Sequence, residues 1–276
     1  MTINIISPGH SSILRLKDLV EVKGSSSNGI VLVKLSSPFG GRVFELNQIP
    51  TNDDGSWGLS VSFNTGGDRT IAAAGFNGSG VLVASASIQI QLLSYTTLIP
   101  IRPLPVGVNQ GLSSAKESTM RSLLGVPGSL TKDCSSVTDP TIQGLLVTEN
   151  VGPFRVTGLK PALEALKRIF SKVQADEPEL YSQLGTAGML CCRAIRGSTT
   201  KFSNHSWGTA IDIKISSELD DVGDDKAQFG LLKLAHYFNE EKFFWGAGFN
   251  SVGREDSMHF EVSEQLIQDW KSSGQI

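Results

Sequence analysis

The sequence predicts two domains: first an all-β sandwich, then an α+β domain with a small antiparallel sheet. The chain has 276 residues, which exceeds the usual size of one domain. Apolar and polar residues alternate at period two through residues 1–92, between clusters of Gly, Asn, Asp and Ser. Helical and strand patterns are mixed from residue 113 onward. These observations indicate two segments of different fold class.

The first domain is assigned to residues 1–92. In the segment 56–63, Trp57, Leu59 and Val61 fall on one face of an extended chain. Six or seven short strands separated by turn clusters predict an immunoglobulin-like sandwich. We expect these strands at residues 4–6, 19–23, 29–34, 43–46, 56–63, 70–74 and 80–91.

Three segments of this first domain, VEVKGSS, DGSWGLSVSF and TIAAAGFNGSG, resemble bacterial immunoglobulin-like modules. Modules of this kind often serve as spacers or adhesion units beside enzymes of the cell envelope. The resemblance therefore implies a positioning or binding role for residues 1–92, and this domain has no cluster of charged residues that indicates chemistry.

A proline-rich linker is expected at residues 93–112. Its sequence contains Pro100, Pro103 and Pro105, and closely spaced prolines favour extended backbone that acts as a semi-rigid spacer. The second domain is accordingly assigned to residues 113–276.

The second domain mixes helices and strands. Leu163, Leu166 and Ile169 form a helical stripe within residues 160–176. Further helices are expected at residues 225–238 and 262–270, the second with Ser263 as N-cap. Strands are expected at residues 189–195, 209–215 and 257–262. This order predicts an α+β domain with a small antiparallel sheet.

Composition excludes several classes of protein. Hydrophobic residues make up 39% of the chain, so it is not disordered as a whole. A net charge of -3 argues against a nucleic-acid binder, which would carry basic patches. No apolar run reaches the ~18 residues of a membrane span. The first residues, MTINIISPGHSS, lack the features of a secretory signal. We expect a monomer without a transmembrane segment.

The three cysteines fit neither a zinc motif nor a disulfide scaffold. They are Cys134 and the adjacent pair Cys191 and Cys192. Either they are buried thiols that behave as small hydrophobic residues, or Cys134 forms a bridge with Cys191 or Cys192. The sequence leaves both alternatives open.

Polar residues interrupt two apolar strands of the second domain. In the segment 210–215, the isoleucines face one way and Asp212 faces the other. In the segment 258–262, His259 lies on the face opposite Phe260. If the two strands are neighbours, Asp212 and His259 converge on one face. His205 lies seven residues before Asp212, and Gly208 would let the backbone turn between them.

Two histidines and one carboxylate make up a zinc ligand set. Catalytic zinc sites use three protein ligands and leave one position for water, whose pKa the metal lowers. Such a site also needs a general base close to that water. Asp256, three residues before His259, could supply it from the turn that precedes the strand.

Two segments around these residues match a known signature. SNHSWGTAID (203–212) fits SxHxxGxAxD, and DSMHFE (256–261) fits [DE]xxHF. Together they resemble the D-alanyl-D-alanine carboxypeptidase family of zinc peptidases, which includes vancomycin-resistance carboxypeptidases and dipeptidases and phage L-alanyl-D-glutamate endolysins. The resemblance covers residues 145–270. It implies zinc bound by His205, Asp212 and His259, with Asp256 as general acid/base.

The resemblance also implies substrate contacts. In this family an arginine before the first histidine contacts a substrate carboxylate or the developing oxyanion, and here Arg193 and Arg196 are the candidates. Arg193 is preferred because it ends an apolar segment. Ser203 and Trp245 are the other expected substrate-binding residues. For Trp245 the alternative is ordinary core packing.

The implied function is zinc-dependent hydrolysis of peptidoglycan stem peptides, by carboxypeptidase or L-Ala-D-Glu endopeptidase action. This substrate class places the protein at the cell envelope or outside the cell. One alternative is an envelope binding or adhesion protein whose zinc site is catalytically inert, as in hedgehog-type relatives of this fold; the presence of Asp256 argues against it. The other is a general protease, with specificity set by loops such as residues 216–225.

Overall fold

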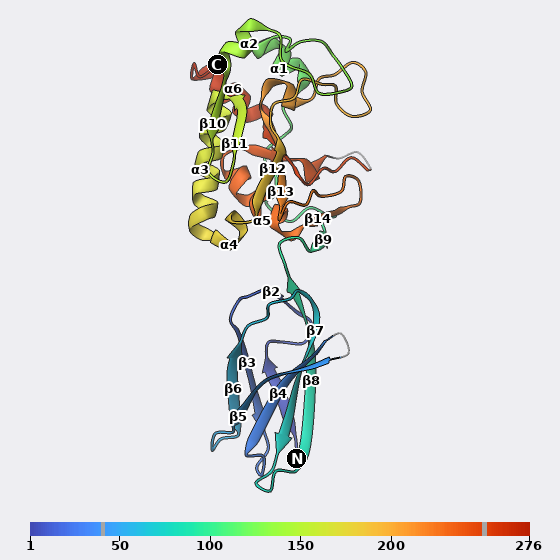
Figure 1. The fold of residues 1–276 in the computed structure, drawn as a ribbon, viewed down its shortest axis with the longest axis vertical. Coiled ribbons are helices and arrows are strands. Elements are labelled where there is room, and N and C mark those ends of the chain that lie inside the picture. Colours follow the sequence, from blue (N-terminus) through green and yellow to red (C-terminus); the bar gives the residue numbers. More distant parts are fainter. Residues whose placement is uncertain (40–41, 250–252) are drawn as a thin grey trace. The chain divides into compact units, whose positions relative to one another are not determined.

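The computed structural model describes residues 1–39, 42–249 and 253–276. The chain folds into two compact units, Met1–Ser94 and Tyr95–Ile276 (Figure 1). Each unit has its own hydrophobic core. No helix in the described part of the chain is long and apolar enough to cross a membrane.

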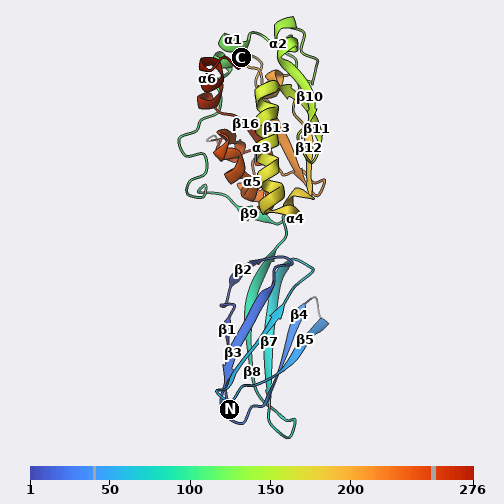
Figure 2. The ribbon, with the colours of Figure 1, turned by 90° about the vertical axis from the view of Figure 1, so that its left-hand side faces the viewer.

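Unit 1 consists of two β-sheets (Figure 2). The three-stranded sheet has the order β1-β3-β6 and the five-stranded sheet the order β2-β8-β7-β4-β5. All pairs are antiparallel except β2 with β8. The strands are β1 (Ile3–Ser7), β2 (Ser12–Arg15), β3 (Val20–Ser26), β4 (Leu32–Phe39), β5 (Arg42–Pro50), β6 (Ser56–Val61), β7 (Gly67–Phe76) and β8 (Leu82–Leu93).

The core of unit 1 lies between these sheets, because alternating residues of both point inward. Val22 of β3 is fully buried, as are Val33 of β4 and Ile71 of β7. Trp57 of β6 packs over Gly24 of β3, where a Cβ would overlap the indole ring. All of the expected strands overlap observed ones, and unit 1 is a β-rich sandwich. The short β2 was not expected, because four residues (Ser-Ile-Leu-Arg) are too few for a period-two pattern.

The proline-rich segment is part of unit 2, whereas we expected a spacer over residues 93–112. β9 (Leu98–Pro100) pairs with β14 (Lys226–Gln228). Ile101 is fully buried in the core of unit 2. Asn109 exchanges two hydrogen bonds with the backbone of Trp245, at 2.8 and 2.9 Å. One buried apolar side chain and one amide that pairs with a strand therefore fix this segment in place.

Unit 2 is built on a four-stranded antiparallel sheet. Its order is β12 (Leu184–Gly188), β13 (Ala210–Ile215), β16 (His259–Val262) and β15 (Phe243–Trp245). The fully buried isoleucines of β13 share a core with α3 (Lys160–Asp176) and α5 (Phe229–Glu240). Because side chains alternate along a strand, Asp212 lies on the opposite face. One face of the sheet is thus core, and the other is available for a site.

Shorter elements complete unit 2. β10 (Leu146–Asn150) and β11 (Arg155–Leu159) form a separate hairpin. Ser263 caps α6 (Glu264–Ser272) by accepting a hydrogen bond from the Leu266 amide at 3.1 Å, as expected. The remaining elements are α1 (Glu117–Leu124), α2 (Pro140–Leu145), α4 (Pro178–Tyr181) and the 3-10 turns η1 (Asn204–Trp207) and η2 (Gly246–Gly248).

Two expected elements are wrong in part. Residues 189–195 do not form a strand: the strand is β12, and the following residues form an irregular extended segment with isolated bridges at Cys192 and Ala194. The backbone groups of residues 189–195 form hydrogen bonds with loops instead of a strand. The apolar character of this buried segment was therefore mistaken for a strand pattern. The helix expected at 225–238 begins at Phe229, because Lys226–Gln228 pairs with β9 as β14.

The contact between Gly24 and Trp57 generates a prediction for unit 1. Gly24→Ala should lower the free energy of unfolding of this unit by about 2–3 kcal/mol, because the added methyl group overpacks the core. Gly78→Ala is the matched control, since no atom lies within 4 Å of its added Cβ. Calorimetry of the full chain should show a lower transition temperature for unit 1 alone. Equal stability of the two variants would contradict this packing.

Candidate metal centre

Asp212 and His259 are direct cross-strand partners in the antiparallel pair β13–β16. This pairing places both side chains on the face of the sheet away from the core. Nδ1 of His259 lies 3.1 Å from Oδ1 of Asp212. The convergence that the alternation of the two strands predicts is therefore present in the structure.

His205 reaches the same place from η1, through a turn at Gly208. Gly208 has a left-handed backbone with φ of 64°. A Cβ at this position would lie 2.6 Å from Cα of Gly158, so glycine is required both for the conformation and for the close approach. The turn brings Nε2 of His205 within 3.2 Å of Oδ1 of Asp212.

The three side chains present one donor atom each at the corners of a small triangle. The distance between Nε2 of His205 and Nδ1 of His259 is also 3.2 Å. These separations approach the edge of about 3.3 Å expected between ligands that surround zinc tetrahedrally at about 2.0 Å. In the described part of the chain, this is the group of His, Cys, Asp and Glu side chains with the geometry to hold a metal ion.

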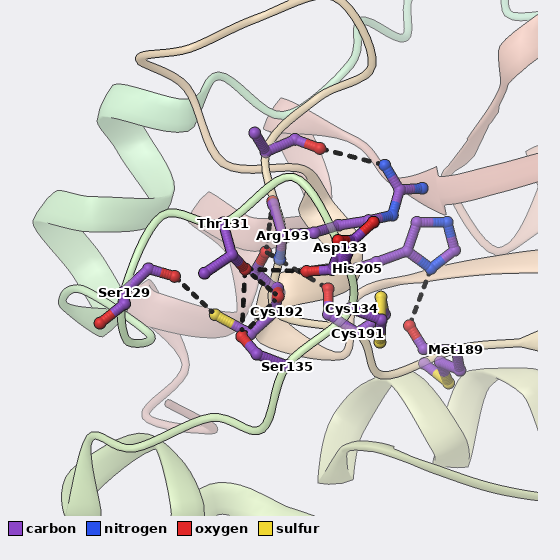
Figure 3. The surroundings of a disulfide bond; sticks show 12 residues. Ser129, Thr131, Asp133, Cys134, Ser135, Met189, Cys191, Cys192, Arg193 and His205 are labelled. Carbon is purple, nitrogen blue, oxygen red and sulfur yellow. Dashed lines mark hydrogen bonds between the residues drawn. A yellow bond between two sulfur atoms is a disulfide. The ribbon is translucent and has the colours of Figure 1, made fainter.

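Hydrogen bonds on the far side of each imidazole fix which nitrogen faces the triangle. Nδ1 of His205 lies 2.8 Å from the carbonyl oxygen of Met189, which can only accept a hydrogen bond (Figure 3). Nε2 of His259 donates to Oε2 of Glu261 at 2.8 Å. Each imidazole therefore directs a lone pair at the centre of the triangle, as is usual for histidine ligands of metals.

Glu261 is itself held in the interior. Its side chain is 4% exposed and accepts a hydrogen bond from Nδ2 of Asn204 at 3.0 Å. Asn204 also donates to the carbonyl oxygen of Ala115 at 3.1 Å. Glu261 thus links the ring of His259 to η1, which carries His205.

The charges of the site favour a cation at its centre. Burial would raise the pKa of the Asp212 carboxyl, but hydrogen bonds from His205 and His259 in their protonated forms outweigh it and hold the pKa far below its usual value. Burial would lower the pKa of His259, but hydrogen bonds to Asp212 and Glu261 raise it well above the usual value. The buried carboxylate of Glu261 and the partly buried one of Asp212 therefore stabilise positive charge at this point, which fits a divalent cation.

Asp256 lies beside the triangle, in the turn that leads into β16. The His259 amide donates to the Asp256 carbonyl at 3.2 Å. Burial raises the pKa of the Asp256 carboxyl, and the charge of His259 opposes that shift. Its Oδ1 is buried without a hydrogen-bond partner among the described residues. A carboxylate oxygen in this state can accept a proton from a water molecule.

Trp245 lies in the core and does not line the cavity, which is the core-packing alternative that the sequence left open. It has no exposed surface and stacks on Phe260 of β16. Its Nε1 donates to the carbonyl oxygen of Ser257 at 2.6 Å. The indole thereby fixes the turn that contains Asp256. Gly246, which follows, has no room for a Cβ, since one would lie 2.5 Å from the Asp256 carbonyl oxygen.

A cavity of about 440 Å³ is lined by Asp212 and His259 of the triangle and by Asp256. Arg193, Arg196 and Ser203 line this cavity, and their expected contact with substrate stays a prediction. Arg193 is half-buried and donates from Nη1 to the carbonyl oxygen of Ala194 at 3.1 Å. Arg196 is exposed at the edge of the cavity.

A disulfide braces the irregular segment behind His205. It joins Cys134 to Cys191, which is one of the two pairings that the sequence left open, and Cys192 is a buried free thiol (Figure 3). The Cys191 amide donates to the His205 carbonyl at 3.0 Å. Ser135 and Cys192 exchange backbone hydrogen bonds at 3.0 and 3.1 Å. The bridge therefore ties the loop at Cys134 to the segment that orients the first histidine.

Three residues of the site were not singled out from the sequence. The sequence could have identified Glu261, because this residue lies two positions after His259 and so shares its face of the strand. Asn204 is adjacent to His205 within the matched motif. Met189 contributes a backbone carbonyl, which the identity of its side chain does not reveal.

A family model described as D-alanyl-D-alanine carboxypeptidase matches residues 196–262. The match includes His205, Asp212, Asp256 and His259, and it begins after Arg193. It supports, at the level of the family, a peptidase related to D-alanyl-D-alanine carboxypeptidases. No curated protein matches the chain.

Solved structures also show similarity to parts of the chain. The fibronectin(III)-like modules of CbhA from Clostridium thermocellum are 11% identical, with a TM-score of 0.27, over 33% of this chain and 94% of theirs. The endo-beta-1,4-mannanase from Thermotoga petrophila is 24% identical, with a TM-score of 0.26, over 34% of this chain and 20% of its own. CopC from Methylosinus trichosporium OB3b is 11% identical, with a TM-score of 0.26, over 33% of this chain and 92% of its own.

The hydrogen bond from His259 to Glu261 generates a prediction about metal affinity. Glu261→Gln should weaken zinc binding about 10–100-fold, because the imidazole loses its buried anionic partner. Glu45→Gln, at an exposed position of β5, removes the same charge far from the triangle and should leave zinc binding unchanged. Competition with a chromophoric chelator measures both dissociation constants. Equal values for the two variants would contradict the assigned role of Glu261.

The disulfide generates a second prediction. Cys134→Ser should lower the free energy of unfolding of unit 2 by about 2–4 kcal/mol and should also weaken zinc binding, because the segment that orients His205 loses its brace. Cys192→Ala removes the free thiol but keeps the bridge, so its zinc affinity should match the wild type. Thermal unfolding and chelator competition measure the two effects. Unchanged zinc affinity in folded Cys134→Ser would limit the bridge to a stabilising role.

Proposed function

We propose that this protein is a zinc-dependent peptidase that hydrolyses peptidoglycan stem peptides. The observation that supports the proposal best is the triangle of His205, Asp212 and His259. Its donor separations of 3.1–3.2 Å and its two oriented imidazoles suit zinc. A family model described as D-alanyl-D-alanine carboxypeptidase matches the segment that contains all three residues.

The donor set fits zinc better than the harder divalent cations. Two imidazole nitrogens and one carboxylate oxygen are ligands typical of zinc, whereas calcium and magnesium prefer oxygen ligands. When bound, zinc would polarise the scissile carbonyl and lower the pKa of a water molecule in its fourth position. His205, Asp212 and His259 would hold it, with Glu261 and the Met189 carbonyl keeping both rings in place.

Asp256 is the proposed general base. Its buried Oδ1, which has no hydrogen-bond partner among the described residues, would accept the proton of the attacking water. The same carboxyl would then give that proton to the leaving amine. Burial raises the pKa of Asp256, and this makes the protonated carboxyl more accessible for the second step. The indole of Trp245 acts through the turn at Ser257 and is a positioning residue.

Arg193 is the proposed partner for negative charge near the reacting atoms. Its guanidinium is half-buried, stays charged and spends one donor on the Ala194 carbonyl. The remaining donors can bind a substrate carboxylate or the oxygen that becomes negative during attack. Ser203 would contact substrate from the wall of the same cavity.

The proposal includes two modes of cleavage, carboxypeptidase action and endopeptidase action. We further propose that unit 1 is an immunoglobulin-like module that positions the enzyme or binds the cell wall. The proposed substrate belongs to the cell envelope, and we propose that the protein acts there.

The proposal predicts the result of digesting purified peptidoglycan. Zinc-loaded wild-type protein should release products, and Asp256→Ala should lower the rate about 100-fold or more, because the general base is lost. Asp53→Ala, at an exposed position of unit 1, is the matched control and should keep the wild-type rate.

Mass spectrometry of the products separates the two modes of cleavage. Released D-Ala indicates carboxypeptidase action, and new N-terminal D-Glu indicates endopeptidase action. Absence of any product from zinc-loaded wild-type protein would reject the peptidase proposal and favour a binding protein with an inert zinc site.

A further inference from the structure

In the described part of the chain, three arginines without a carboxylate partner line the cavity. They are Arg193, Arg196 and Arg254. None of them forms an ion pair with Asp or Glu among the described residues. The protein as a whole has a net charge of -3, so this concentration of positive charge is local.

The carboxylates of the cavity already have partners of their own. Glu117 is paired with Arg121 one helical turn later in α1. Glu261 is paired with His259. Asp212 is paired with both histidines of the triangle. Among the described residues that line the cavity, Asp256 is the remaining carboxylate that can balance three guanidinium groups, and a divalent cation on the triangle would add further positive charge. The cavity therefore attracts anions.

The three arginines fall into two groups by position. Arg193 is half-buried near the triangle, where burial lowers the pKa of its guanidinium and the charge of Arg196 adds to the effect. Arg196 and Arg254 are exposed at the edge of the cavity. Nη1 of Arg254 donates to the carbonyl oxygen of Arg196 at 3.3 Å. One arginine thus belongs to the reacting centre and two belong to the rim.

The Arg254 side chain lies against the backbone of the segment that carries Arg196. Gly197 has φ of 78°, and a Cβ there would approach Nη2 of Arg254 to 3.5 Å. The Arg254 side chain therefore lies along the backbone of Arg196 and Gly197. Its Nε and Nη2 make no hydrogen bond within the described part of the chain, and they remain available to a ligand.

We propose that Arg196 and Arg254 form a second carboxylate-binding subsite, which makes the cavity selective for acidic peptides. The inference rests on the proposed peptidase function and deepens it. Guanidinium groups bind carboxylates through two parallel N–H donors, which neutral or amidated peptides cannot match. Ile195 and Val222, both partly exposed in the cavity wall, provide apolar contacts for the rest of the peptide.

Peptide binding tests the subsite separately from hydrolysis. Two synthetic stem pentapeptides serve as probes: one has a free carboxyl on its second residue, D-glutamate, and the other has this carboxyl amidated. All binding is measured by calorimetry on zinc-loaded protein that carries Asp256→Asn, so that hydrolysis does not interfere. The acid should bind about 10-fold more tightly than the amide, because the peptides differ in one charge-assisted contact at an exposed site.

Substitutions then assign the preference to the two arginines. In R196Q/R254Q the ratio of the two dissociation constants should fall to about 1. Arg155→Gln, at an exposed position of β11, is the matched control and should keep the ratio near 10. Rising salt should reduce the preference, because exposed charges are screened. Thermal unfolding checks that each variant is folded.

The outcomes separate the subsite from the peptidase. Equal binding of acid and amide, binding of neither, or a preference that survives in R196Q/R254Q would overturn the subsite. Wild-type protein, incubated with the same peptides and followed by mass spectrometry, reports hydrolysis independently. Hydrolysis without a preference rejects the subsite alone. A preference that depends on the two arginines supports the subsite even where hydrolysis is absent and the peptidase proposal fails.

Discussion

The cross-strand pair of Asp212 and His259 is the contact on which the site of unit 2 depends. Antiparallel pairing of β13 with β16 holds the two backbones at a fixed separation, so their side chains meet without any loop having to close. His205 completes the triangle only because Gly208 turns the chain against Gly158. Two of the three donors are thus fixed by a sheet, and the third is fixed by a turn that requires glycine.

The residues around the triangle hold its donor atoms in place, but they include carboxylates whose burial is electrostatically unfavourable. Placing Asp212 and Glu261 in the interior is unfavourable unless positive charge lies between them. Hydrogen bonds to the Met189 carbonyl and to Glu261 orient the two imidazoles, and Asn204 in turn holds Glu261. The disulfide, the buried indole of Trp245 and the proline-rich segment brace the loops that carry these groups. This arrangement explains why residues far apart in sequence contribute to one small site.

The period-two alternation of β13 and β16 was enough to predict the meeting of Asp212 and His259, because side-chain direction in a strand follows from sequence position alone. The N-cap at Ser263 was predictable for the same reason, since it depends on local backbone geometry. The disulfide partner of Cys134 was not predictable. Cys191 and Cys192 are adjacent, and the direction of each side chain depends on the backbone of an irregular segment. Trp245 was assigned to the cavity from its position before the second motif. The sequence alone does not show whether an aromatic residue at this position lines the cavity or packs in the core. Only the packing of Phe260 shows that it belongs to the core.

X-ray absorption at the zinc edge of the loaded full chain tests the central claim most directly, because it reports the atoms bound to the metal. The account predicts one zinc per chain, surrounded by nitrogen and oxygen at about 2.0–2.1 Å, with the outer-shell scattering of two imidazoles. It also predicts that this signal is lost in His205→Ala. A sulfur shell at about 2.3 Å, or an unchanged spectrum in that variant, would contradict a site built from His205, Asp212 and His259.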